Sequence, residues 1–326
     1  MPSKQLKSPE QRQHLSLSSY AYEVVQNDSM TFMGEKNISG FINTIIGNCS
    51  ESYFDGTDIK KKDSALRSFS KNISIKIRLR TKVYDDYYPR LGESWFGSKF
   101  KITQGEYIKA LIEDYSRKTF YDRESIFYKE VIDTLSNYLN MDGSKRGYIP
   151  IILNTGEKYY VKPYKISDEY EAPYHYLVCL SSDNPNTKMI PASFRISRIA
   201  TVKDHVTSYG SGKITQSEIK ELERKIKENG VPYIIGNTIE VTVKLTSIGL
   251  NMYNSIFHQR PIYRSCAKNT DGSTLLVFNS TERQITNYFF QFGHEAEIVS
   301  PDETRNYMIN RYKDAVKSYN HKTGGK

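Results

Sequence analysis

The stretch Pro173–Leu180, PYHYLVCL, is the part of the chain that says most about the fold. After its opening proline it is aromatic and apolar, interrupted only by His175. A short apolar run that starts at a turn residue is typical of a buried β-strand. Side chains alternate along a strand, so His175 and Tyr176 point to opposite faces and at most one of them lines a pocket directly. Of the two, we expect Tyr176.

Similar short strands are predicted on both sides of this stretch. The segments GYIPIIL, EKYYVKPYKI and KMIPASFRISRI begin at Gly147, Glu157 and Lys188. Turn sequences such as Asn-Thr-Gly and Asp-Asn-Pro-Asn separate them. Many short strands at this spacing predict a small, strongly bent sheet or barrel over residues 142–207.

The remainder, 208–326, alternates helical and strand patterns. The helix TQSEIKELERKIKENG has a capping box at Thr215 and Glu218 and a glycine stop at Gly230. Apolar strand-like and helical segments then alternate, and a last helix is predicted from about Ser300 to Tyr319. This order predicts a small α+β domain that resembles a ferredoxin-like unit.

The first segment, 1–141, contains two weak repeats at about 12–56 and 73–130. Each combines a strand pattern with helical patterns, and the apolar positions of FINTIIGNCSESYF align without gaps with those of YIKALIEDYSRKTF. Ser39 and Thr103 are predicted helix caps. Strand, helix, helix resembles the ribbon-helix-helix fold, so the region is predicted to be ribbon-helix-helix-like, with the two copies in tandem. The aligned pairs are Phe41/Tyr107, Ile42/Ile108, Ile45/Leu111, Ile46/Ile112 and Phe54/Phe120.

Bulk composition limits the class of protein. The chain has 326 residues, a net charge of +9 and three cysteines. This length predicts two or three domains. The helix and strand patterns of the three segments described above predict the α+β fold class. The cysteines fit neither a disulfide framework nor a zinc site, and no apolar run is long enough for a membrane helix, so we expect a cytoplasmic protein. The excess of Lys and Arg is not concentrated in a terminal tail, so a polyanion would have to bind to a local cluster of basic residues.

Three motifs resemble those of the WYL family, which is named for a Trp-Tyr-Leu triplet in a small SH3/Sm-like barrel. They are VKPYKI around Pro163, the triplet His175-Tyr176-Leu177, and FRISRI at 194–199. The segment that begins DGSTLLVF is similar to the C-terminal extension of that barrel, so the resemblance covers roughly 145–320. The chain departs from the family at His175, where Trp is expected, and at Ser197, where an acid is common.

The resemblance implies a non-enzymatic sensor whose barrel binds nucleic acid, often single-stranded. A ribbon-helix-helix-like front on this barrel resembles the accessory proteins of type VI, RNA-targeting CRISPR systems, which bind single-stranded RNA and enhance the nuclease. The partners implied are therefore single-stranded RNA or DNA, with RNA favoured, an RNA-guided nuclease, and a second copy of the chain bound through the C-terminal extension.

The strongest cationic pattern is SIKIRLRTK, from Ser74 to Lys82. In a strand, one face carries isoleucine and leucine and the other carries Lys76, Arg78 and Arg80. A two-stranded ribbon fits the DNA major groove, which makes these three residues candidate nucleic-acid ligands. A solvated edge strand protected by cations is the alternative. The first repeat offers only His14, Ser16 and Ser18 on its outward face, so we expect an asymmetric ribbon, cationic on one strand and neutral on the other.

In the barrel, lysines and tyrosines at positions 158, 160, 162 and 164 share one strand face. Aromatic rings beside cations suit single-stranded nucleic acid, because bases stack on the rings while Lys and Arg neutralise phosphates. Tyrosines that simply pack around a small barrel are the alternative. The resemblance favours a ligand site formed by Lys162, His175, Tyr176, Arg195 and Arg198.

Catalytic and metal motifs are not predicted. The sequence has no HExxH, GxSxG or GxGxxG pattern, and YGSGKIT from Tyr209 lacks the glycine and hydroxyl residues of a P-loop. We therefore expect no enzyme, no cofactor and no metal site. Two other functions stay open: a transcriptional regulator that binds duplex DNA under control of a barrel ligand, and a sensor of a small anionic nucleotide.

Overall fold

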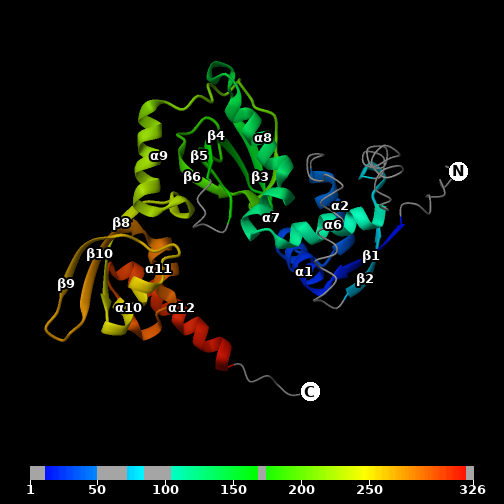
Figure 1. Ribbon diagram of the computed structural model, residues 1–326. Coiled ribbons are helices and arrows are strands. Elements are labelled where there is room, and N and C mark those ends of the chain that lie inside the picture. The colour runs from blue at the N-terminus through cyan, green and yellow to red at the C-terminus, as the bar shows by residue number, and fades with distance from the viewer. Residues whose placement is uncertain (1–11, 50–71, 84–103, 168–173, 321–326) are drawn as a thin grey trace. The chain divides into compact units, whose positions relative to one another are not determined.

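Figure 1 shows the computed structural model, which describes residues 12–49, 72–83, 104–167 and 174–320. The chain divides into two compact units, Met1–Asp133 and Thr134–Lys326. Both helices and antiparallel sheets are present, so the α+β class is confirmed.

The first unit is built on a two-stranded antiparallel ribbon. Strands β1 (Arg12–Ser18) and β2 (Asn72–Arg78) pair along their full length, from Arg12 opposite Arg78 to Ser18 opposite Asn72. The strands of the two predicted repeats therefore pair within one chain. The described residues of this unit also form the helices α1 (Ser19–Met33), α2 (Ile38–Asn48), α6 (Gln104–Arg117) and α7 (Phe120–Phe127). Helix α8 (Lys129–Asn140) leads into the second unit.

The predicted apolar stripes of α2 and α6 form the core of this unit. Their four aligned pairs are all buried in one cluster, together with Leu15 and Leu17 of β1 and Ile77 of β2. These side chains lie on the inner face of the ribbon, because residues that alternate along a strand share a face. Phe54, the partner of Phe120 in the fifth aligned pair, lies outside the described residues.

The start of α2 differs from the one predicted at Ser39. The side chain of Asn37, not of Ser39, caps α2, because its Oδ1 accepts the backbone N–H of Gly40 at 2.8 Å. The prediction for Ser39 was wrong, since Ser39 lies within the first turn, where its hydroxyl instead contacts the backbone of Arg78. Thr103 lies outside the described residues.

The second unit contains a five-stranded antiparallel sheet in the order β6-β5-β4-β3-β7. Every residue of strand β5, which lies between β6 and β4, is buried. On one face of the strand, burial comes from an apolar contact with two helices. Tyr176, Val178 and Leu180 pack there against Leu222 of α9 (Gln216–Asn229) and against Val231 of the short helix η5 (Val231–Tyr233). The strands are β3 (Ile149–Leu153), β4 (Lys158–Ser167), β5 (Tyr176–Ser182), β6 (Ile190–Arg195) and β7 (Ile199–Val202).

Helix α9 has the termini that its sequence predicts. The Thr215 hydroxyl and the Glu218 carboxylate form the capping box, and Gly230 follows the last turn with a φ of 75°. The helix lies beside the five-stranded sheet in the same unit (Figure 1).

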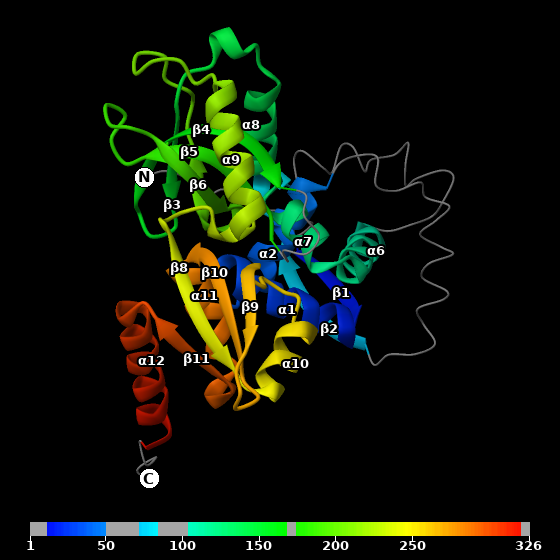
Figure 2. The same cartoon turned by 90° about the vertical axis from the view of Figure 1, so that its left-hand side faces the viewer.

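A four-stranded antiparallel sheet in the order β11-β8-β10-β9 follows in the chain. Its apolar face packs against helices α10, α11 and α12 around Phe278 and Phe289, and α12 lies beside β11 (Figure 2). Strand β9 forms one edge, and all six of its side chains are exposed. The elements are β8 (Thr238–Leu245), α10 (Ser247–Ser255), β9 (Tyr263–Lys268), β10 (Thr274–Thr281), α11 (Glu282–Phe290), β11 (Ala296–Ser300) and α12 (Asp302–Asn320).

Candidate nucleic-acid interface

The outer face of the ribbon carries basic side chains directly opposite one another. Arg12 faces Arg78 across the strands, and His14 faces Lys76. All four side chains are exposed, as is Arg80 just beyond the end of β2. No ion pair within the described part of the chain involves these five residues. Like charges directly opposite each other destabilise a ribbon, so this face is one that a bound anion would stabilise.

The structure corrects the expected asymmetry of the ribbon. Arg12 belongs to β1 and brings a second guanidinium to the outer face, so both strands are cationic there. Ser18, expected on the outer face, is buried, since it caps α1 and both its N–H and its hydroxyl donate to the Glu113 carboxylate, at 2.6 and 2.8 Å. The sequence pattern missed Arg12 because the partner of Arg78 depends on the register between strands far apart in the chain.

Helix α2 holds the cationic end of β2 in place. The buried side chain of Asn43 donates to the carbonyl of Arg78 at 2.8 Å and accepts the backbone N–H of Arg80 at 2.7 Å. The N–H of Arg78 donates to the Ser39 hydroxyl at 3.2 Å. Because α2 satisfies these backbone groups, Arg78 at the end of the paired ribbon and Arg80 just beyond it are presented on a fixed scaffold.

Replacing Arg12 with Gln should make the free protein more stable. The change removes a cross-strand like-charge contact and leaves the exposed polar surface intact, so we expect a gain of about 0.2–1 kcal/mol in unfolding free energy. Urea unfolding at low salt measures it, and Arg117→Gln at the far end of α6 is the control. A loss of stability in the Arg12 variant would show that the guanidinium is satisfied within the fold.

One cavity of the second unit is lined by a single one of the five residues predicted for the barrel site, Lys162. That cavity, of about 660 Å³, lies between β4, the segment 187–191 and α9. The Lys162 ammonium lies 3.6 Å from the Glu218 carboxylate and 5.5 Å from the centre of the Tyr148 ring, and its side chain is 13% exposed. Burial alone would raise the pKa of Glu218, but its hydrogen bonds to Thr215 and the nearby Lys162 ammonium outweigh that and lower it. Lys162 is therefore already neutralised by α9.

The other four predicted residues lie on or beside strands β5 and β6 of the five-stranded sheet. His175 and Tyr176 are buried, and Tyr176 belongs to the apolar contact with α9. Arg195 is opposite Tyr176 on β6, and its guanidinium lies over the ring of Tyr174. Arg198 is exposed in the short helix η4 (Ile196–Arg198). The five residues do not converge on one described pocket.

A different group of tyrosines and lysines gathers around strand β4 of the five-stranded sheet. We call it the tyrosine platform and define it by the three rings of Tyr148, Tyr160 and Tyr209 and the ammonium groups of Lys158 and Lys203. The rings of Tyr160 and Tyr209 meet edge to face at 5.4 Å, and the Lys158 ammonium lies 4.6 Å from the centre of the Tyr160 ring. A β-carbon placed on Gly210 would lie 3.5 Å from the Tyr148 hydroxyl, which brings Tyr148 close to the Tyr209–Gly210 turn.

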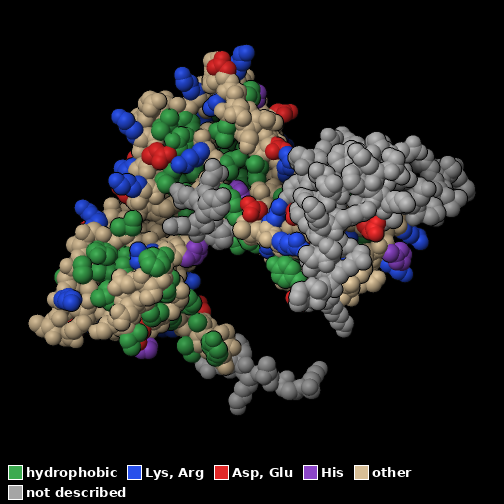
Figure 3. All heavy atoms as spheres, in the orientation of Figure 1, with side chains coloured by type: hydrophobic (Ala, Val, Ile, Leu, Met, Phe, Trp, Pro, Cys, Tyr) green, Lys and Arg blue, Asp and Glu red, His purple; other side chains and the backbone are tan. Residues whose placement is uncertain are grey.

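The platform is electropositive. The hydrogen bond from Lys158, reinforced by the nearby charges of Lys158 and Lys203, lowers the pKa of Tyr160. No ion pair in the described ranges involves either lysine. Figure 3 shows Lys and Arg side chains distributed among hydrophobic side chains over the region of α9 and the five-stranded sheet. Sequence analysis identified Lys158 and Tyr160 through strand alternation but missed Tyr148, Lys203 and Tyr209, because those residues come from other segments.

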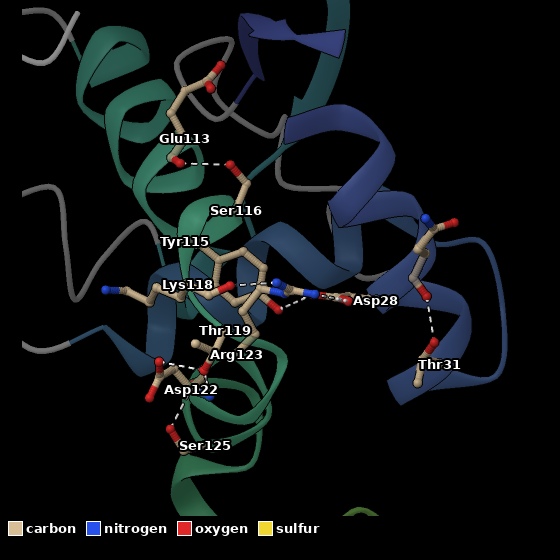
Figure 4. A network of polar contacts seen from close by, with 11 residues as sticks. Asp28, Thr31, Glu113, Tyr115, Ser116, Lys118, Thr119, Asp122, Arg123 and Ser125 are labelled. Atoms are coloured by element: carbon tan, nitrogen blue, oxygen red, sulfur yellow. Dashed lines mark hydrogen bonds and ion pairs between the residues drawn. The ribbon is translucent and has the colours of Figure 1, made fainter. Parts of the chain in front are cut away.

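A buried charged network fixes the helices of the first unit. The Asp28 carboxylate of α1 accepts from the Arg123 guanidinium of α7 and from the Tyr115 hydroxyl of α6, both at 2.7 Å (Figure 4). Arg123 also donates to the carbonyl of Lys118 at 2.7 Å. Burial, followed by the charge of Asp28, raises the pKa of the Tyr115 hydroxyl. These side chains pair with one another inside the unit, so we assign them a role in stability and not in ligand binding.

Metal sites and membrane-spanning helices are both absent from the described ranges. No group of three or more His, Cys, Asp or Glu side chains lies close enough there to hold a metal ion. No helix in those ranges has the length and apolar character needed to cross a membrane.

Comparison with known proteins adds one informative similarity. No protein-family profile matches the chain, and no curated protein matches it. A solved structure described as a CRISPR Cas-related protein is similar over 99% of this chain and 98% of that one, at 21% identity and a TM-score of 0.74. The mixed α+β fold of this chain is thus shared by a known structure over nearly its whole length. The proteasome accessory factor PafBC of Arthrobacter aurescens is similar over 72% of this chain and 35% of that one, at 10% identity and a TM-score of 0.28.

Proposed function

We propose that this protein is a non-enzymatic nucleic-acid-binding protein that acts as an accessory to an RNA-guided, type VI CRISPR nuclease. The observation that carries nucleic-acid binding is the outer face of the ribbon, where Arg12 lies opposite Arg78 and His14 opposite Lys76. A polyphosphate backbone would neutralise that face, and counterion release would add to the affinity. The accessory role is supported by the shared fold with a CRISPR Cas-related protein and by the motifs of the barrel.

The three parts of the chain fit the domains that the resemblance implies. In the first unit, two strands pair antiparallel over a helical core, which suits the proposed ribbon-helix-helix-like domain. The five-stranded antiparallel sheet around β5 is our candidate WYL barrel. The last part has the element order β-α-β-β-α-β and the strand order β11-β8-β10-β9, which suits a ferredoxin-like domain.

Single-stranded RNA is the ligand that we favour. Bases of an unpaired strand stack on aromatic rings at about 1–3 kcal/mol each, while cations beside the rings neutralise phosphates. The tyrosine platform provides both kinds of group, with exposed Tyr209 at its edge and Lys158 and Lys203 as its cations. The bases of a duplex are stacked on each other and cannot use the rings in this way.

The double variant Tyr160→Leu/Tyr209→Leu tests the single-strand assignment. We expect it to weaken binding of a single-stranded RNA by roughly 5- to 150-fold for each base that loses its stacking partner, with duplex DNA binding unchanged. Tyr319→Leu, on the strongly exposed end of α12, is the matched control. Equal affinity of wild type and variant for single-stranded RNA would reject the platform as the binding surface.

A DNA-binding regulator is the second candidate, and the ribbon is the observation that favours it. A two-stranded ribbon fits the major groove, and its outward arginines can contact guanine there. This function predicts tighter binding of a duplex than of single-stranded RNA at equal salt, with the Tyr160→Leu/Tyr209→Leu variant indistinguishable from wild type. The same titrations therefore separate the two candidates.

We also propose that the protein forms a homodimer through its last domain. The edge strand β9 leaves one row of backbone groups without a neighbouring strand in the described sheet, and its six side chains are exposed. An edge of this kind is a ready template for pairing with another chain. The molecular mass in solution tests this proposal, and a monomer at micromolar concentration would reject it.

A further inference from the structure

A second, smaller cavity lies in the last part of the chain and shares no residue with either surface described above. It has a volume of about 200 Å³ and is bounded by the C-terminal end of α9, by η5 and by the connection between α10 and β9. Ile226, Pro232, Phe257 and Ile262 provide apolar walls, while Asn229 and Arg260 bring polar groups. The function proposed above uses none of these residues.

Asn229 has an unusual position in this cavity. It is the last residue of α9 and is 1% exposed, and neither its amide nitrogen nor its amide oxygen has a hydrogen-bond partner among the described residues. A buried donor or acceptor without a hydrogen bond lowers the stability of the fold, and most buried polar groups are therefore paired. A buried amide that lines a cavity and lacks both partners points to a ligand with an acceptor and a donor side by side.

The opposite wall combines an aromatic ring with a cation. The Arg260 guanidinium lies 4.6 Å from the centre of the Phe257 ring, and its Nη1 donates to the Tyr253 carbonyl at 3.2 Å. Phe257 is 68% exposed, so it forms the rim. Lys227 and Glu228 also line the cavity, and the Glu228 carboxylate is paired with Arg224 at 2.6 Å. The charge available to a ligand is therefore positive.

The wall that carries Arg260 is held in shape without a ligand. Gln259 has a φ of 56°, a left-handed conformation that is uncommon for a residue other than glycine. Its side-chain oxygen accepts from the Tyr233 hydroxyl at 2.6 Å, and its carbonyl accepts from the buried Gln284 amide at 3.4 Å. These contacts fix the backbone next to Arg260.

We propose that this cavity binds a nucleotide, with its base against Asn229 and its phosphate near Arg260 and Lys227. Adenine is the base that fits best, because its N7 acceptor and N6 donor match the donor and acceptor of an asparagine amide. The Phe257 ring stacks on the base as it enters, and the rim must open, because the Asn229 amide is covered in the free protein. The site does not depend on RNA binding by the platform, since a free nucleotide would satisfy the same groups.

Calorimetric titration of the full chain with AMP and with UMP tests the proposal. We expect AMP to bind more tightly than UMP, and Asn229→Leu to weaken AMP binding by roughly 5- to 150-fold, the discrimination typical of one bidentate base contact. Arg260→Gln should weaken both nucleotides, and Lys188→Gln in the larger cavity is the control. The thermal midpoint of Asn229→Leu checks folding, and it should not fall, because an apolar group replaces an unpaired amide.

The source of the nucleotide is distinguished by a second ligand, an adenosine-only RNA strand. If free AMP does not bind wild type but Asn229→Leu weakens binding of the strand, the site accepts a base of a longer RNA. If neither ligand distinguishes Asn229→Leu from wild type, the cavity holds only water and the proposal is overturned. Failure of the platform proposal is separate, since it would show as RNA binding that is insensitive to Tyr160→Leu/Tyr209→Leu.

Discussion

Replacing Asp28 with Ala is expected to destabilise the first unit by about 3–5 kcal/mol, because it leaves a buried guanidinium without its counterion. Asp28 is 2% exposed and the Arg123 side chain 14% exposed, and their atoms lie 2.7 Å apart. The Tyr115 hydroxyl loses its acceptor in the same variant. Since these contacts join α1 to α6 and α7, we expect faster amide hydrogen exchange in all three helices.

An exposed pair in the same unit serves as the control. Lys129 and Asp133 form an ion pair one helical turn apart, and both are substantially exposed. Replacing Asp133 with Ala should change the unfolding free energy by about 0.3–0.5 kcal/mol at most, as expected for a surface pair on a helix. Asp28→Asn separates charge from shape: it should recover part of the loss, because an amide still accepts from Tyr115. If Asp28→Ala and Asp133→Ala have equal effects, the buried network does not hold the helices together.

Of all the variants considered, we expect the one that removes the four exposed Lys and Arg side chains of the ribbon to weaken nucleic-acid binding most. For Arg12→Gln/Lys76→Gln/Arg78→Gln/Arg80→Gln we expect the slope of log affinity against log salt to fall by about 3, at roughly 0.7 for each phosphate contact with a single strand. The affinity should fall by about tenfold for each charged hydrogen bond lost. Fluorescence anisotropy with one RNA at four salt concentrations measures both quantities.

A matched loss of charge elsewhere on the first unit controls for net charge. Helix α6 approaches the ribbon at its first residues, since a β-carbon on Gly105 would lie 3.5 Å from the backbone of His14. Arg117 is exposed at the other end of the same helix. Arg117→Gln/Lys129→Gln should leave the salt slope unchanged. If the two sets of variants lower the slope equally for each charge removed, binding depends on overall charge and the ribbon is not an interface.

The local sequence pattern was enough to predict several helices and strands and which of their faces are buried. The alternation of Ile75, Ile77 and Leu79 with cations predicted which face of β2 packs on the helices, and Thr215, Glu218 and Gly230 marked the ends of α9. The aligned stripes of α2 and α6 predicted core residues for the same reason. Each of these features depends on neighbours within about one turn or one strand, where spacing along the chain determines the face.

The sites depended on contacts between distant segments. Arg12 completes the cationic face only because β1 pairs with β2 in a register that sets it opposite Arg78, and Lys162 is neutralised because α9 brings Glu218 beside it. Tyr209 joins Tyr160, and Asn229 borders a cavity with Arg260, through the same kind of long-range packing. The sequence by itself thus determined which side chains face the core and which carry charge. Only the tertiary structure decided which of those charges are left unpaired, because an ion pair or a register is a relation between segments that local spacing does not encode.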